Sequence, residues 1–111
     1  MPRLLLKNIL RENVENRLNL MRIEVLIEKV LAEVTSAQGE KLTELFAVVC
    51  AQRCAMNEMP YTKFNTMDWQ FIVAGVRSTL QALREEVIAL SNKSDCVRAL
   101  VVALDESMLT N

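Results

Sequence analysis

One heptad-spaced row of apolar residues limits the fold of this 111-residue chain more than any other feature. At positions separated alternately by four and three residues, the chain carries Trp69, Val73, Val76, Leu80, Leu83, Val87 and Leu90. In an α-helix this spacing puts all seven side chains on one side, as a seam for another helix. The pattern therefore predicts a long helix, ending near Ser91, that packs lengthwise against other helices.

The composition favours an all-α protein. Apolar residues make up 51% of the chain, which contains only two glycines and two prolines to interrupt helices. A chain of this length is expected to form one domain. We predict a single helical domain over residues 1–111, a small bundle of four main helices with antiparallel neighbours.

The segment from about residue 3 to residue 35 carries two apolar rows. The first contains Leu20, Ile23, Ile27, Val30 and Val34, and the second contains Val14, Leu18, Met21, Val25 and Ala32. At roughly 100° per residue the two rows lie on different sides of the same helix. Since an ordinary surface helix has one apolar stripe, two rows indicate cover from two directions. The second cover is either another part of this chain or a second subunit.

The ends of this first segment allow more than one interpretation. Asn13 and Asn16 extend the first row, and asparagine is a better cap than helix-interior residue. We favour a break near Asn13, which would give five helices, over one continuous helix in which the asparagines fix register.

Gly39 is expected to end the first segment in a left-handed conformation, with the second segment running from about 40 to 57. A third segment is expected to start near Thr66, and a fourth to be capped by Ser94.

No group of residues points to catalysis, a cofactor or a metal. The chain has no histidine and no glycine-rich phosphate loop. Cys50 and Cys54 share a helix flank, and only Cys96 could add a third soft ligand, so we expect all three to be apolar packing residues. Three cysteines cannot form a complete disulfide framework, and reduced thiols favour a cytoplasmic protein.

Charge and hydropathy argue against nucleic acids and membranes as partners. The formal net charge is −1, and no segment is apolar for the length of a membrane span or an export signal. The alternative function that we keep is a small helical nucleic-acid-binding transcriptional regulator. It would use Arg77 and Arg84, which project from one flank of the third segment.

Two features suggest a protein partner. Arg53 falls within the apolar face of the second segment, where it either pairs with Glu24 or Glu28 or reaches a partner. The link between the second and third segments is long and rich in Met and aromatic residues, which either plug the bundle end or contact another chain. The candidate partner-binding residues are Arg53, Met59, Tyr61, Phe64 and Trp69.

These features together predict a non-enzymatic protein–protein interaction module. It would serve as an adaptor, an assembly factor or an inhibitor of a larger protein, and would form a homo-oligomer through apolar helix faces. The residues predicted to form the seam between subunits are Leu20, Ile23, Ile27, Val76, Leu80 and Leu83.

Overall fold

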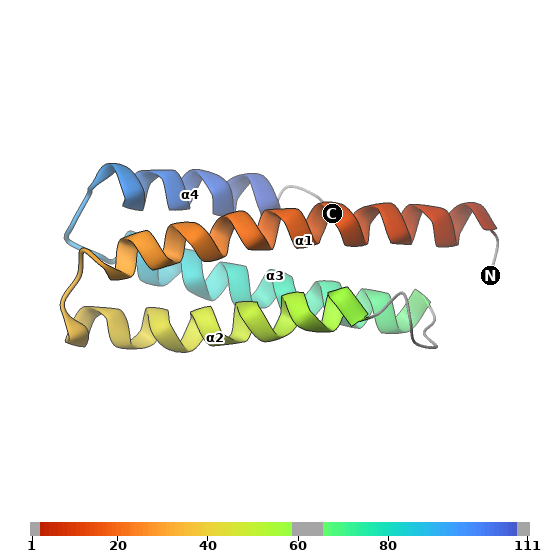
Figure 1. The fold of residues 1–111 in the computed structure, drawn as a ribbon, viewed down its shortest axis with the longest axis horizontal. Coiled ribbons are helices and arrows are strands. Elements are labelled where there is room, and N and C mark those ends of the chain that lie inside the picture. Colours follow the sequence, from red (N-terminus) through yellow and green to blue (C-terminus); the bar gives the residue numbers. More distant parts are fainter. Residues whose placement is uncertain (1–2, 59–65, 109–111) are drawn as a thin grey trace.

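The structure, a computed structural model, describes residues 3–58 and 66–108 and consists of four helices. These are α1 (Arg3–Leu31), α2 (Ser36–Glu58), α3 (Thr66–Ile88) and α4 (Asp95–Met108). Successive helices run in opposite directions and lie side by side (Figure 1). The predicted all-α bundle of four helices with antiparallel neighbours is therefore confirmed.

The helices form a ring in which each packs mainly against two others. α1 and α3 both contact α2 on one side and α4 on the other. With 14 residues α4 is the shortest, whereas α1 has 29 residues and α3 has 23. α4 therefore reaches only to about the middle of α1, and the N-terminal half of α1 continues past it (Figure 1).

The core lies along the axis of the bundle and draws on all four helices. Its most completely buried side chains belong to Leu20, Ile23, Ile27, Val30, Leu42, Val49, Met56, Leu83, Val87, Val97, Leu100 and Leu104. The row predicted between residues 69 and 90 is part of this core, with Val73 partly buried. Burial of such side chains is the main force that stabilises the bundle.

The predicted break near Asn13 is wrong, because α1 is one continuous helix. Asn13 is 2% exposed, and its side-chain amide donates a hydrogen bond of 3.1 Å to the carbonyl oxygen of Met56. Met56 lies in the last turn of α2, where carbonyl groups have no partner within their own helix. The side chain of Asn13 thus provides a hydrogen-bond partner for a carbonyl group at the end of α2. This contact makes an asparagine favourable inside α1.

The predicted role of Gly39 is also wrong. α1 ends at Leu31, α2 begins at Ser36, and no glycine among the described residues has a positive φ. Thr35 and Gln38 form a capping box instead: the Thr35 hydroxyl accepts from the Gln38 backbone N–H, and the Gln38 side-chain oxygen accepts from the Thr35 N–H. Gly39 lies inside α2 against Leu31, whose side chain would be 3.2 Å from an added Cβ.

The start of α3 at Thr66 is as predicted, although the helix ends at Ile88, before the predicted end near Ser91. Ser94 caps α4 as predicted, because its hydroxyl accepts a hydrogen bond of 3.3 Å from the backbone N–H of Val97.

Candidate functional site

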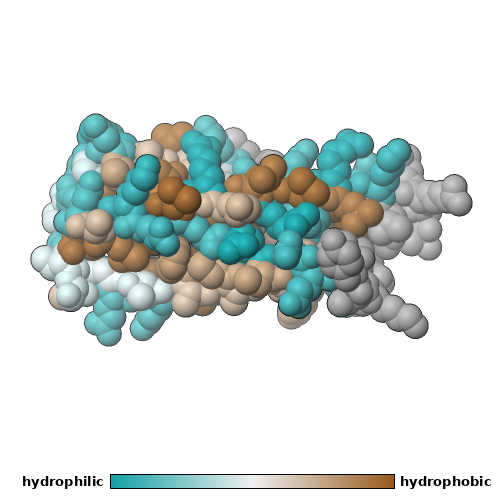
Figure 2. Space-filling view, viewed as in Figure 1, coloured by the Kyte–Doolittle hydropathy of each residue, from teal (hydrophilic) through white to brown (hydrophobic). Residues whose placement is uncertain are grey.

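A row of exposed apolar side chains on α1 is the most distinctive surface of the molecule. Of the nine large hydrophobic residues that are exposed in the described part of the chain, five lie on this helix. They are Leu10, Val14, Leu18, Met21 and Val25, which are 37–60% exposed and which we call the α1 stripe. Figure 2 shows hydrophobic side chains following α1 on the face turned to the viewer, with hydrophilic ones on both sides. Contiguous exposed apolar residues usually mark an interaction site.

The α1 stripe arises because α1 is apolar on two sides. Ile23 and Ile27 on the inner side are completely buried, whereas Leu18 on the outer side is 60% exposed. Four of the five stripe residues belong to the second apolar row in the sequence, and Leu10 extends that row toward the N-terminus. The described part of the chain leaves this row largely exposed, so the inner row supplies the core contacts of α1.

Opposite charges lie near the two ends of the α1 stripe. Arg11 precedes Val14 by three positions and Glu28 follows Val25 by three, so both continue the spacing of the row. Both side chains are exposed, and neither takes part in an ion pair among the residues that the structure describes. The α1 stripe therefore has a positive end and a negative end along one helix.

A partly buried ion pair joins α1 to α2 beside the stripe. The Arg53 guanidinium lies 2.5 Å from a Glu24 carboxylate oxygen, and the Cys50 thiol donates to the other oxygen at 2.9 Å. The hydrogen bond to Glu24, together with the charge of that carboxylate, raises the pKa of Arg53. Burial, and then the hydrogen bond to Glu24, raises the pKa of the Cys50 thiol from 9.0 to about 11. Cys50 is therefore a protonated thiol at neutral pH and a poor nucleophile.

This ion pair confirms the interpretation of Arg53 as the structural partner of Glu24. Arg53 also lines a surface pocket of about 160 Å³ between α1 and α2, together with Val14, Leu18 and Met21 of the stripe. Its side chain is still 30% exposed there. A role for Arg53 in binding a partner stays a prediction, and its place beside the α1 stripe is compatible with both roles.

The other predicted partner-binding residues do not form a described surface. Met59, Tyr61 and Phe64 lie outside the described residues. Trp69 is 4% exposed, and its indole N–H donates a hydrogen bond of 3.1 Å to a Glu12 carboxylate oxygen. The indole of Trp69 thus joins α3 to α1 within the chain, which corrects its assignment to an exposed contact surface.

The residues predicted to form a seam between subunits lie in the core of the single chain. Each is at most 7% exposed, and the six are Leu20, Ile23, Ile27, Val76, Leu80 and Leu83. They belong to the core that the four helices enclose, so they do not form an exposed helix face in this fold. This corrects their assignment to a surface seam, because heptad spacing identifies a helix-packing face but does not say which chain supplies the facing helix.

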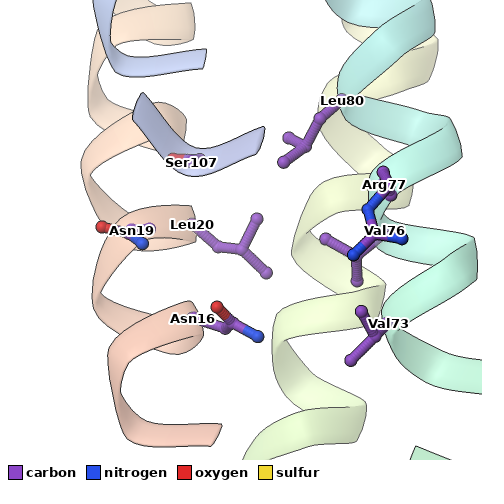
Figure 3. Close-up of a pocket in the computed structure, with 8 residues that line it drawn as sticks. All are labelled: Asn16, Asn19, Leu20, Val73, Val76, Arg77, Leu80 and Ser107. Carbon is purple, nitrogen blue, oxygen red and sulfur yellow. The ribbon is translucent and has the colours of Figure 1, made fainter. Parts of the chain in front are cut away.

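A groove opens between α1 and α3 where α4 ends (Figure 3). Leu20, Val76 and Leu80 form its apolar floor, and Asn16 and Arg77 lie at its sides. It continues toward Trp69 as a pocket of about 450 Å³. Residue patterns did not predict this groove, which exists because the 14-residue α4 leaves one side of the four-helix bundle partly uncovered.

The other candidate sites from the sequence are a nucleic-acid-binding arginine pair and a metal site. Arg84, one of the two arginines predicted to contact nucleic acid in the alternative function, forms an ion pair of 2.6 Å with Asp105 of α4. In the described ranges, no three His, Cys, Asp or Glu side chains are grouped so that they could hold a metal ion. Over the same ranges, no helix combines the length and the apolar character that crossing a membrane requires.

Comparison of the chain with protein-family models, with curated proteins and with solved structures finds no match. The function must therefore be argued from the surface of the bundle itself.

Proposed function

We propose that this chain is a non-enzymatic protein–protein interaction module that binds a helix of another chain along the α1 stripe. The observation that carries the proposal is the row of five exposed apolar residues on one helix. Such a row is the usual docking face for an amphipathic helix, which supplies anchors at matching intervals. As a small helix-binding domain, the chain would serve as an adaptor, an assembly factor or an inhibitor of a larger protein.

A cytoplasmic location is part of this proposal. Cys50, Cys54 and Cys96 are free thiols in the structure, and free thiols are typical of reducing compartments. Cys54 is exposed, so an oxidising compartment would leave it open to mixed disulfides.

The experiment compares Leu18→Glu with the matched control Phe71→Glu. Phe71 is 82% exposed on α3, outside the stripe, so both variants place a carboxylate at an exposed apolar position. Each purified protein is immobilised and incubated with extract of the source organism to which the purified wild-type chain has been added. The retained proteins are identified and quantified by mass spectrometry.

We expect at least one protein to be retained by the wild type and by Phe71→Glu, and to be lost with Leu18→Glu. A carboxylate at position 18 would have to be desolvated against the partner helix, which is strongly unfavourable. Circular dichroism should show equal helix content in all three proteins. Equal retention of every protein by Leu18→Glu and wild type would contradict the proposal.

A further inference from the structure

We infer that the helix bound by the α1 stripe is α1 of a second copy of this chain, in antiparallel orientation. This inference rests on the proposed function, because it names the partner of the same surface. The order of charges along the stripe and the two-fold symmetry of most protein dimers point to this partner.

The outer row of α1 is a complete heptad repeat with charged ends. Positions 11, 14, 18, 21, 25 and 28 are separated by three, four, three, four and three residues, which is the spacing of a two-helix seam. The four positions between the two ends of the repeat, 14, 18, 21 and 25, are apolar. Arg11 occupies its first position and Glu28 its last, and both side chains are exposed.

An antiparallel second copy matches every position of this repeat. With the two-fold axis between Leu18 and Met21, Leu18 of one copy faces Met21 of the other. Val14 of one copy likewise faces Val25 of the other. Arg11 then faces Glu28 of the second copy, and symmetry produces this pair twice, once at each end. A parallel copy would instead oppose Arg11 to Arg11 and Glu28 to Glu28, which is destabilising at close range.

The residues that flank the repeat favour the same orientation. Glu15 and Arg22 follow Val14 and Met21 by one position, so they occupy the same side of the seam. In an antiparallel pair, Glu15 of one copy comes close to Arg22 of the other, and charges at such flanking positions set helix orientation. Arg22 is half-exposed and bound to Glu106 at 2.8 Å, so it can contact a second carboxylate without losing the first.

The length of the seam sets the expected strength. From Arg11 to Glu28 the helix is about 26 Å long at 1.5 Å per residue, and the contact is one helix wide. This is small for a specific interface, so we expect a reversible dimer with a Kd on the order of 10 μM.

The test measures the Kd by sedimentation equilibrium for wild type, Arg11→Glu, Glu28→Lys and the double variant with both changes. Each single change turns two attractive pairs into two repulsive ones, so we expect the Kd to rise about tenfold. The double variant reverses both charges and restores both pairs, so its Kd should return to within about twofold of wild type. The matched control is Lys41→Glu, an exposed charge reversal on α2 that should leave the Kd unchanged.

Two results would overturn the inference. If neither single variant differs from wild type, the helices are not antiparallel, because a parallel pair opposes like charges in all these proteins. If wild type is monomeric at about 100 μM, the partner is not a second copy. In that case, retention of a different protein that depends on Leu18 would still support the proposed function, so the two proposals fail separately.

Discussion

The two faces of α1 carry the same kind of residue and have opposite environments. On the inner face, Leu20, Ile23 and Ile27 are at most 1% exposed among the other three helices. On the outer face, Leu18 and Met21 are 60% and 49% exposed. Both rows follow helical periodicity, so periodicity identifies a surface that packs but not the chain that covers it.

The charges explain which face turns inward. Arg11 and Glu28 flank the outer apolar residues from Val14 to Val25, whereas the inner row continues past Leu20 to Asn13, whose amide finds a carbonyl partner on α2. Burying an arginine and a glutamate in the core without partners would cost more than the apolar contacts gain. The outer row is therefore suited to contact a surface whose charges are opposite to those of Arg11 and Glu28.

The largest difference in unfolding free energy is expected between variants that place an aspartate on the inner face and on the outer face of α1. Ile27→Asp buries an unpaired carboxylate in the core and should lower the free energy of unfolding by more than about 4 kcal/mol. Leu18→Asp should change it by less than about 0.5 kcal/mol, because position 18 is exposed in the single subunit. Urea unfolding at about 1 μM protein, well below the Kd proposed for the second copy, measures both values.

Similar losses in the two variants would contradict this comparison, since they would mean that the outer row belongs to the core of the subunit. Leu80→Asp provides a second test of the inner side, because Leu80 is 3% exposed on α3 and its variant should behave like Ile27→Asp.

A smaller effect is expected from the ion pairs that flank the outer row. Arg53→Met leaves the buried Glu24 carboxylate with only the Cys50 thiol and should cost about 2 kcal/mol, because the pair is mostly but not fully buried. Arg22→Met removes the half-exposed pair with Glu106 and should cost less than about 0.5 kcal/mol. Thermal unfolding followed by circular dichroism distinguishes the two. Equal, small losses would mean that Arg53 is not a structural partner of Glu24.

Much of the fold could be predicted from the sequence because helical periodicity is a local property. The row between residues 69 and 90, the start of α3 at Thr66 and the cap at Ser94 all depend on nearby residues. The break at Asn13 was predicted wrongly because the partner of its amide, the Met56 carbonyl, lies 43 residues away. Gly39 was misassigned for a related reason: its contact with Leu31 is known only once α1 and α2 are placed.

The candidate site was predicted less well. The sequence carries two apolar rows in the first segment, and the predicted subunit seam used inner residues such as Ile23, which the structure places in the core of the single chain. The arrangement of the other three helices shows which of the two rows is covered. Trp69 was misplaced because an aromatic residue has the same periodic signal whether it plugs the core or faces a partner.

The most direct measurement of the central claim is the oxidation rate of two methionines as a function of protein concentration. Met21 lies in the α1 stripe and is 49% exposed, whereas Met56 is fully buried in the core. Hydroxyl-radical footprinting with mass spectrometry should show Met21 reacting quickly at about 1 μM and being increasingly protected toward about 100 μM as the second copy covers it. Met56 should stay protected throughout. A Met21 oxidation rate that is the same at both concentrations would contradict the account.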